Sequence, residues 1–469
     1  TPLMSDSQVN DEQNALKAGP PILPVVRPCR IGDGILALPE DEQERLRAVS
    51  ASSPDDVQFF VPASGSGSRM FSFLEAYLSH PSNELTEQAQ RFFSKLPSFA
   101  FFRKLPDQLQ QSYLDGTLQI ADFIHFLLDC EGLNYGHLPK ALIPFHKHEP
   151  FVLNAFQEHL AQGHDLSKGA VRFHFTIQEE YTQAFIESKN ELSALTRQDY
   201  QIDFSSQDKN TDAYVFDEDL QLIKDDDGQA LRRPAGHGTL LQNLLQLRAP
   251  YILVKNIDNI QHFTQKQQSI DNWKFLLGLQ IEIRSQLKNF LENQNWAGLQ
   301  AWNANIGLFE SASISNLSSD EWSELLNRPL RVCGMVRNNG QPGGGPFLME
   351  LNGHLTKQII EKNQLASHPQ VSQLMLQSAY FNPVLMVLSP CDLNGQFHDL
   401  TQFADPNSYL VVEKTLQGKK VQFIERPGLW NGAMAKWNTL FVEVPSGVFS
   451  PVKSALDLLD FAHQANKGA

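Results

Sequence analysis

Short hydrophobic segments alternate with longer amphipathic ones along most of the chain. Residues 57–62 are β-rich, and they lead through a glycine- and serine-rich turn into residues 70–78, where apolar side chains recur at helical spacing. Further strand-like segments lie at residues 171–177, 214–216, 251–254 and 331–336, and helical periodicity lies at residues 178–187, 240–247 and 273–295. This alternation predicts an α/β fold with a mixed, mostly parallel sheet flanked by helices.

Three regions extend this predicted core. Residues 84–130 have helical periodicity, which indicates a helical insertion at about residues 72–135. Residues 1–55 are proline-rich and irregular apart from a short helical stretch at 41–49, so we expect an N-terminal arm or cap. Later β-rich segments lie at residues 409–413, 420–425 and 440–444. We therefore predict a cap at 1–55, a core at 56–330, and at 331–469 the remainder of the same unit.

Composition excludes several classes of function. The chain has 469 residues, 41% of them hydrophobic and 19% charged, as in ordinary globular proteins. Its net charge of -15 disfavours a nucleic-acid partner, so a phosphorylated ligand would need local cations and backbone amides. No apolar run approaches the ~20 residues that span a bilayer, and no secretory signal is evident. We expect a cytoplasmic protein without a membrane partner.

The cysteines give no sign of a metal centre or a disulfide framework. All four are widely spaced, without a Cys-x-x-Cys pair: Cys29, Cys130, Cys333 and Cys391. Such spacing is typical of a protein in a reducing compartment.

The turn after residue 62 is the first candidate for chemistry. It consists of Ala63, Ser64, Gly65, Ser66, Gly67, Ser68 and Arg69. Glycine permits close backbone approach, so successive amides can converge on phosphate oxygens. The following helix would add its positive end, and Arg69 a mobile guanidinium. The glycine spacing is neither that of a P-loop nor that of a Rossmann motif. Taken alone, the turn is equally compatible with a flexible linker.

A second segment, Leu138-Pro-Lys-Ala-Leu-Ile-Pro-Phe145, contains Lys140. A Pro-Lys pair by itself is typical of a surface turn. Together, however, the two segments resemble the sugar-nucleotide pyrophosphorylases, which carry Gly-x-Gly-[Thr/Ser]-Arg-Met followed by Pro-Lys-x-Leu-[Ile/Leu]-Pro. The resemblance implies that the loop holds a triphosphate and that Lys140 balances charge during transfer. About 70 residues separate Arg69 from Lys140, more than in that family, and the helical insertion would account for them.

A further pair of motifs lies in the middle of the chain. In Arg233-Pro-Ala-Gly-His-Gly238, Gly236 and Gly238 would let His237 approach a ligand, although His237 could equally be a capping residue. Asp258, in Asn256-Ile-Asp-Asn259, follows a strand at the edge where open α/β sheets bind ligands. Its carboxylate could hold Mg²⁺ or form an Asx turn. The pair is similar to the Pro-x-Gly-His-Gly and Asn-Ile-Asp-Asn motifs of the UDP-glucose pyrophosphorylase branch.

The C-terminal region continues this resemblance. Residues 444–459 resemble the Val-Pro-x-x-x-Phe-x-Pro-Val-Lys-x-x-x-Asp-Leu-Leu segment of the same branch, which implies that Lys453 binds phosphate. The alternative is an exposed lysine that caps a helix at Asp457. Glu425 lies in a string similar to Leu-Glu-x-x-x-Gly of those enzymes. The family commonly has arginines where this chain has Ser446, Gly447 and Val448.

Residues 337–346 are the most unusual string, with three consecutive glycines after a predicted strand. Asn338 could contact sugar hydroxyls, and Gly344 could permit close approach of a sugar phosphate. The strings VPASG, PGGGPF and GLWNGAMAKWNT resemble the uncharacterised bacterial family DUF4301 over most of the chain, which implies no activity. Residues 428–438 could be a wall facing a sugar or base, or structural packing.

These observations predict a nucleotidyltransferase with a Rossmann-like GT-A core. It would transfer a nucleotidyl group from a nucleoside triphosphate, with UTP as the expected donor, to a sugar 1-phosphate and release pyrophosphate. Arg69, Lys140 and Lys453 would neutralise phosphate charge, and Asp258 would hold Mg²⁺. Two alternatives stay open: a sugar-nucleotide-dependent transferase on the same fold, and a non-catalytic protein that binds a nucleotide or a sugar phosphate.

Overall fold

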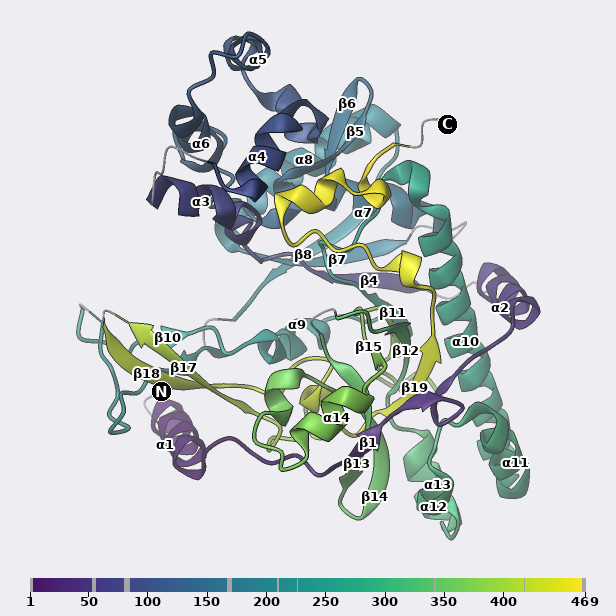
Figure 1. Ribbon diagram of the computed structural model, residues 1–469. Helices are drawn as coiled ribbons and strands as arrows, with labels where there is room; N and C mark the ends of the chain where they lie inside the picture. Colours follow the sequence, from purple (N-terminus) through teal and green to yellow (C-terminus); the bar gives the residue numbers. More distant parts are fainter. Residues whose placement is uncertain are drawn as a thin grey trace. The chain divides into compact units, whose positions relative to one another are not determined.

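The computed structural model describes residues 3–52, 56–79, 85–166, 171–208, 211–225, 227–340, 343–416 and 418–465. The chain forms two compact units, each assembled from three separate stretches (Figure 1). Unit 1 contains residues 1–57, 207–253 and 275–446, and unit 2 contains residues 58–206, 254–274 and 447–469. The division at residues 55 and 330 that the sequence suggests stays a prediction about functional domains.

Unit 1 is built on a mixed sheet. Its strands, in spatial order, are β2 (Arg30–Ile31), β3 (Gly34–Leu36), β19 (Asn438–Glu443), β12 (Leu330–Arg337), β16 (Met386–Ser389) and β11 (Tyr251–Val254). From β2 to β12 the neighbours are parallel, whereas β12 pairs antiparallel with β16 and with β15 (Tyr380–Phe381). Strands β11 and β16 are buried along their whole length, as expected for a sheet covered on both faces.

Two hairpins accompany this sheet. The first joins β13 (Gly345–Leu351) to β14 (His354–Ile360), and β1 (Val25–Pro28) adds a third antiparallel strand. The second joins β17 (Leu410–Leu416) to β18 (Lys419–Glu425) and lies beside α1 (Leu3–Ala18) and β9 (Ala213–Tyr214), which pairs with β10 (Arg232–Arg233). Leu16 of α1 packs with Phe216 and Ile424 in one apolar cluster.

The expectation that residues 1–55 are irregular apart from one short helix was therefore wrong. Helix α1 is polar on most of its surface and contributes few apolar side chains, so its sequence has little helical periodicity. Strand β1 ends at Pro28, which is tolerated because β1 pairs on one side only, at the edge of its sheet. The short helix that the sequence did predict is α2 (Glu40–Ser52).

Helices surround the sheet of unit 1. They are α9 (Leu241–Leu244), α11 (Trp296–Ile306), α12 (Ser311–Ile314), α13 (Ser319–Leu326) and α14 (Val371–Gln377), and α10 (Gln267–Glu292) contributes residues to both units. Gly278 lets α10 approach α2 closely, because a Cβ there would lie 1.9 Å from the carbonyl oxygen of Leu46.

Unit 2 has a parallel sheet of β4 (Val57–Pro62), β7 (Arg172–Ile177) and β8 (Gln201–Ser206), with α7 (Ala155–Gly163) and α8 (Thr182–Thr196) between them in sequence. A hairpin of β5 (Pro144–His148) and β6 (Phe151–Asn154) precedes α7. The C-terminal segment ends in two short 3₁₀ turns, Ala455–Leu459 and Phe461–His463.

The segment predicted to form a helical insertion contains four helices in its described residues, all of them in unit 2. They are α3 (Ser72–Ser79), α4 (Glu87–Ser94), α5 (Asp107–Leu114) and α6 (Ile120–Leu128), which lie together in Figure 1. The interior of the segment is aromatic: the rings of Phe92, Phe99 and Phe101 contact one another at centroid distances of 5.0 to 6.0 Å. In the part of the chain described here, no helix is both long enough and apolar enough to span a membrane.

Candidate functional site

The glycine- and serine-rich loop follows β4 and is fixed at both of its ends. Ala63 donates its amide hydrogen to the carbonyl oxygen of Thr176, at 2.8 Å. Ser66 forms an isolated antiparallel bridge with Pro139, in which the amide of Gly67 donates to Leu138 and that of Lys140 donates to Gly65, each at 2.9 Å. The chain therefore leaves this bridge, forms the helical insertion, and returns to place Lys140 beside the loop.

The two glycines of the loop have different surroundings. Gly67 is buried, and a Cβ there would lie 2.3 Å from Cδ1 of Ile143 and 3.2 Å from the carbonyl oxygen of Leu138. Gly65 is exposed, and a Cβ there would meet nothing within 4 Å. Gly67 is thus needed for packing, whereas Gly65 lies on the open side of the loop, next to the exposed Ser66.

Three side chains from distant parts of the sequence meet beside this loop. The ammonium groups of Lys140 and Lys453 both contact Oδ2 of Asp258, at 3.1 and 2.9 Å. Lys140 also donates to the carbonyl oxygen of Val452, at 2.8 Å. The side chains of Lys140 and Asp258 are 13% and 9% exposed, whereas that of Lys453 is 58% exposed. One lysine is therefore fixed in the interior and the other can reach outwards.

The backbone holds this group of three residues in place. Val452 donates its amide hydrogen to the carbonyl oxygen of Asp258, at 3.0 Å. Asn259 and Pro451 form a bridge, and the side chain of Asn259 accepts a hydrogen bond from the amide of Ser450, at 2.9 Å. The loop after β11 and the C-terminal segment consequently form one rigid support for Asp258 and Lys453.

Electrostatics keeps the carboxyl of Asp258 ionised. Burial by itself would raise the pKa of Asp258, but the charges of Lys140 and Lys453 outweigh it and lower that pKa below its ordinary value. Burial lowers the pKa of Lys140; Asp258 opposes this effect, and the nearby charges of Lys453 and Arg69 add to it. The site therefore combines an ionised carboxylate with closely spaced cations, and an anion would relieve the repulsion between the cations.

The predicted nucleotide-binding residues Gly236, His237 and Gly238 lie in unit 1, at the start of a 3₁₀ turn. Gly236 has φ of 74°, which favours glycine. The amide of Leu429 donates to Nδ1 of His237 at 2.9 Å, so the ring proton is on Nε2, which donates to Glu361 at 3.1 Å. Both ring nitrogens thus have partners inside unit 1, and whether this segment binds nucleotide stays a prediction.

Residues 236–238 and 425–430 interlock in unit 1. A Cβ on Gly238 would lie 2.1 Å from the carbonyl oxygen of Pro427, and one on Gly428 would lie 2.5 Å from Cε1 of His237. The rings of His237 and Trp430 stack at a centroid distance of 4.3 Å. Sequence reasoning missed Glu361 as a partner of His237, because no local pattern connects two residues 124 positions apart.

The two carboxyl groups near His237 have pKa values shifted in opposite directions. The hydrogen bond from His237 lowers the pKa of the Glu361 carboxyl, whereas burial raises that of Glu425. Oε2 of Glu425 would lie 2.9 Å from a Cβ on Gly236, so the predicted sugar-phosphate residue Glu425 belongs to this cluster. Gly238 also lines an open pocket of about 1130 Å³, together with Arg232 and Arg426.

The remaining predicted residues have local structural contacts in unit 1. The side chain of Asn338 accepts a hydrogen bond from the amide of Gly340, at 2.9 Å. Gly344 is buried, and a Cβ there would lie 2.6 Å from Cγ2 of Ile359. Residues 341 and 342 of the same string lie outside the described residues. The part of Asn338 and Gly344 in binding a sugar phosphate stays a prediction.

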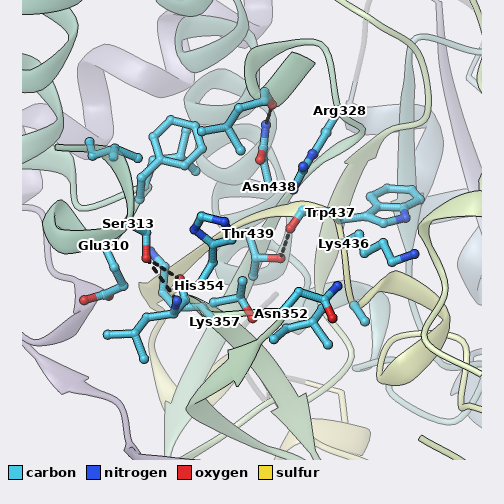
Figure 2. Close-up of a pocket in the computed structure, with 18 of the residues that line it drawn as sticks. Glu310, Ser313, Arg328, Asn352, His354, Lys357, Lys436, Trp437, Asn438 and Thr439 are labelled. Carbon is cyan, nitrogen blue, oxygen red and sulfur yellow. Dashed lines mark hydrogen bonds between the residues drawn. The ribbon is translucent and has the colours of Figure 1, made fainter. Parts of the chain in front are cut away.

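Residues 428–438 pack inside unit 1, which favours the structural alternative for this segment. Leu429, Met434 and Trp437 are buried. The fully buried Arg331 donates from Nη1 to the carbonyl oxygen of Trp430, at 2.7 Å, and from Nε to Oγ1 of Thr439, at 2.9 Å. The end of the segment reaches a separate pocket of about 370 Å³ (Figure 2).

This pocket is lined by polar groups, and the sequence singled out only those in residues 436–438 of the segment just described. Glu310, Ser313, His354 and Lys357 lie along one part of it, and Lys436 to Thr439 line another. None of the predicted site residues is among its described lining residues. Burial lowers the pKa of Lys357 to about 8.

Comparison with known proteins places the chain in a family. The sequence profile of a family described as "Domain of unknown function (DUF4301)" matches residues 3–464. The chain belongs to this family. The matched span contains every predicted site residue of this DUF4301 protein, but the family description assigns no activity to any of them.

Other comparisons add little to this family assignment. No curated protein matches the DUF4301 chain. Among solved structures, UDP-glucose phosphorylase from Trypanosoma brucei matches with a TM-score of 0.39 and 14% sequence identity, over 68% of this chain and 60% of that chain. The DUF4301 chain thus aligns with about three fifths of the length of that protein.

Proposed function

We propose that this DUF4301 protein is a nucleotidyltransferase with a GT-A-like core, which uses a nucleoside triphosphate, UTP in the first instance, and a sugar 1-phosphate. One observation carries the proposal. Lys140 and Lys453, from two different stretches of unit 2, contact the same oxygen of Asp258, beside a glycine-rich loop that follows a parallel strand. Cations and loop amides grouped in this way are suited to bind phosphate.

In the proposed reaction, a phosphate oxygen of the sugar 1-phosphate attacks the α-phosphorus of the nucleotide in line. A new phosphorus–oxygen bond forms, the bond from the α-phosphorus to the bridging oxygen of the β-phosphate breaks, and pyrophosphate leaves. The protein supplies positioning and charge neutralisation, because this transfer requires little covalent participation by side chains.

The predicted site residues of unit 2 have distinct roles in this scheme. Within the described residues, the amides of Ser64, Gly65 and Ser66 donate no hydrogen bond, which leaves them free to bind triphosphate oxygens. Arg69 is exposed and adds a guanidinium. Lys140 is fixed through its own amide, whereas the more exposed Lys453 can move onto a phosphate as the substrate arrives.

Asp258 is the proposed Mg²⁺ ligand. Its ionised carboxylate is the hard oxygen ligand that Mg²⁺ prefers, and substrate phosphates and water would complete the coordination. If substrate phosphates bound the two lysines, Oδ2 of Asp258 would lose these contacts and could serve as a ligand of Mg²⁺. The bound ion would reduce the negative charge that builds up on the phosphates.

One observation favours the alternative of a non-catalytic nucleotide- or sugar-phosphate-binding protein. Residue 447, where the related enzymes commonly have arginine, is glycine here, and a Cβ would lie 2.2 Å from Oε1 of Gln268. A larger side chain at this position would have to displace Gln268. The contacts that arginine would make are therefore missing from this part of unit 2.

A pyrophosphate-release assay tests the proposal. The full chain is incubated with Mg²⁺, each of the nucleoside triphosphates and a panel of sugar 1-phosphates, and we expect release with at least one combination. Nucleotide binding without release would support the binding protein. Release of nucleoside diphosphate from a sugar nucleotide, without pyrophosphate release, would support a sugar-nucleotide-dependent transferase.

Variants test which residues act. Removing one charge-stabilising group typically lowers kcat by about 100- to 1000-fold, so we expect this for Lys140→Met and Lys453→Ala. Lys453→Ala should leave the thermal midpoint nearly unchanged because its side chain is largely exposed. Lys95→Ala, at an exposed lysine of the same unit, is the matched control and should retain full activity. Full activity of both site variants would exclude Asp258 and its two lysines as the catalytic centre.

A further inference from the structure

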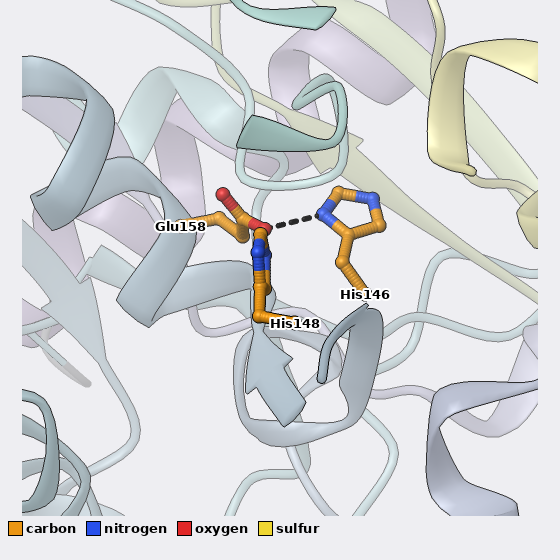
Figure 3. A group of neighbouring side chains, drawn as sticks. All are labelled: His146, His148 and Glu158. Atoms are coloured by element: carbon orange, nitrogen blue, oxygen red, sulfur yellow. Dashed lines mark hydrogen bonds and ion pairs between the residues drawn. The ribbon is translucent and has the colours of Figure 1, made fainter. Parts of the chain in front are cut away.

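A second polar cluster lies in unit 2, on the hairpin before α7. His146 and His148 are two residues apart on β5, so their imidazoles project from the same face of the strand. Both rings meet Glu158 of α7 (Figure 3). Nδ1 of His146 and Nε2 of His148 lie 2.8 and 2.5 Å from the same oxygen, Oε1 of Glu158. Nothing in the proposed transfer reaction uses these residues.

The three residues are largely withdrawn from water. The side chains of His146 and Glu158 have no exposed surface, whereas that of His148 is 21% exposed. The three candidate ligand atoms all lie within 4.8 Å of one another. His148 therefore lies between an otherwise closed site and the solvent.

The ring of His146 is held at both of its nitrogens. Nε2 lies 3.0 Å from Nδ1 of His463, and Nδ1 lies 2.8 Å from Oε1 of Glu158. The ring is therefore oriented so that Nδ1 faces the same carboxylate oxygen as Nε2 of His148.

The surroundings supply the outer partners that metal sites use. A metal-bound histidine usually donates its other ring N–H to an acceptor, and bound carboxylates are themselves hydrogen-bonded. Nε2 of His146 faces Nδ1 of His463, at 3.0 Å, and Gln162 donates to Oε2 of Glu158, at 2.8 Å. The ring of His262 stacks on His148 at a centroid distance of 4.3 Å and interacts through Nε2 with the carbonyl oxygen of Lys147.

We propose that Nδ1 of His146, Nε2 of His148 and the carboxylate of Glu158 bind one divalent transition-metal ion of the Zn²⁺ class. Two imidazoles and one carboxylate form a common ligand set for Zn²⁺, in which water takes the fourth position. Any protons at these two nitrogens would be released to solvent when the metal binds, and the ligands would separate slightly from their present contacts. The chemistry of the site requires neither the nucleotide nor the sugar phosphate.

Bound metal would strengthen unit 2 next to the phosphate site. Glu158 shares α7 with His159 and Gln162, whose side chains bond to the carbonyl oxygens of Ile257 and Gln261, at 3.0 and 2.7 Å. Those carbonyls belong to the loop that carries Asp258. The ion would therefore tie the β5–β6 hairpin to α7, and through α7 to this loop.

Metal titration of the full chain tests the proposal. The purified protein is stripped with a chelator and titrated with Co²⁺, then with Zn²⁺. We expect one equivalent of Co²⁺ with the visible absorption of a four-coordinate ion, loss of that absorption when Zn²⁺ displaces it, and a higher thermal midpoint in the metal-bound protein. A folded wild-type protein that takes up no metal would overturn the proposal and leave the cluster as a hydrogen-bonded group without a metal.

Variants separate this site from adventitious binding. His148→Gln is the principal variant because His148 is partly exposed, and Glu158→Gln preserves the side-chain shape. Both should weaken binding by more than the ~10- to 100-fold expected for His463→Asn, which alters only an outer partner. His125→Gln is the matched control, since exposed His125 contacts Asp129 at 2.8 Å but has no third ligand among the described residues. Metal uptake by His148→Gln equal to that of the wild type would place the ion elsewhere and overturn the assignment.

Discussion

Buried ionisable groups in this protein lie in two different environments. In unit 2, the buried carboxylate of Asp258 has two lysines as counter-charges, which offset part of the cost of its burial. In unit 1, Lys357 is buried and donates to the carbonyl oxygen of Gly307. The nearby acidic groups, chiefly Cys29 and Glu310, affect its pKa less than burial does. Burial of an ammonium without a close carboxylate disfavours the charged form. Lys357 should therefore lose its proton at a lower pH than an exposed lysine does.

We expect Lys357 to make stability rise with pH in the alkaline range. Its folded-state pKa of about 8 lies below the ordinary lysine value of 10.5, so between these values the unfolded chain holds a proton that the folded chain has released. Wild-type stability should gain about 1.4 kcal/mol per pH unit in this window from that residue. The penalty is complete below pH 8 and is removed as pH approaches 10.5.

Denaturant unfolding at several pH values checks this expectation. The advantage of Lys357→Met over the wild type should be greatest below pH 8 and fall by about 3 kcal/mol by pH 10.5. Replacing the exposed Lys362 by Met should leave the pH dependence unchanged. A constant difference between wild type and Lys357→Met across the window would contradict the predicted protonation change.

The four free cysteines should divide into one reactive thiol and three protected ones. Burial raises the pKa of Cys29 to about 12 and that of Cys333 to about 11, and Cys391 is also buried. Cys130 is exposed, although its hydrogen bond to Glu131 raises its pKa. Because the thiolate is the nucleophile, a disulfide reagent should label one thiol in the folded protein and four after unfolding.

Two variants assign this reactivity. Cys130→Ser should abolish the labelling of the folded protein. Glu131→Gln should accelerate it, because the carboxylate that raises the thiol pKa is gone. Rapid reaction of two or more thiols under native conditions would show that a buried cysteine is accessible.

At the scale of elements, the bridge between the glycine loop and the Lys140 segment is the feature that closes the helical insertion. Gly67→Ala should cost about 1 to 3 kcal/mol, because the new Cβ would crowd Ile143 and the backbone of Leu138. Gly65→Ala, in open space two residues away, should change stability by less than about 0.5 kcal/mol. Chemical denaturation measures both.

A second substitution shows whether crowding is the cause. The nearest atom to the added Cβ is Cδ1 of Ile143, which valine lacks. Ile143→Val should therefore recover much of the stability lost in Gly67→Ala, although alone it should be mildly destabilising. Additive effects of the two substitutions would mean that the backbone contact with Leu138 dominates.

The elements were predictable where burial and periodicity are strong. Strands β4, β7, β11 and β12 are almost wholly buried, so their hydrophobic runs are plain in the sequence. The hairpin of β13 and β14 was not predicted. It begins in the glycine-rich string, and the first three residues of β14 are exposed or half-buried. The local sequence pattern does not identify such a strand, because its pairing with β13 rather than its own periodicity makes it extended.

The candidate site was predictable only in part. Family motifs pointed to Lys140, Asp258 and Lys453, but only the fold brings them to one oxygen, since contacts over 118 and 195 positions have no local signature. The alternating pair His146 and His148 is a signal that could have indicated two metal ligands. Glu158 could not be added, because its approach depends on how α7 packs against the hairpin.

At the scale of the whole molecule, the proposed ligand and the protein carry charge of the same sign. The chain has a net charge of -15, and a nucleoside triphosphate is strongly anionic. Attraction must therefore come from the few cations near the loop, namely Arg69, Lys140 and Lys453. Salt concentration decides which charges the nucleotide experiences, because the screening length is about 30 Å at 0.01 M and about 10 Å at 0.1 M.

We therefore expect nucleotide association to have a maximum in its dependence on ionic strength. From 0.01 to ~0.1 M salt, screening of the whole-chain repulsion should raise the association rate constant. Above ~0.1 M, screening of the local cations should lower it again. Stopped-flow fluorescence with a labelled nucleotide at fixed free Mg²⁺ measures both limbs. Lys453→Gln should reduce the rate constant and make its decline above ~0.1 M salt less steep, whereas Lys95→Gln should do neither. A rate constant that falls steadily from the lowest salt concentration would contradict the prediction and show that the local cations dominate at every distance.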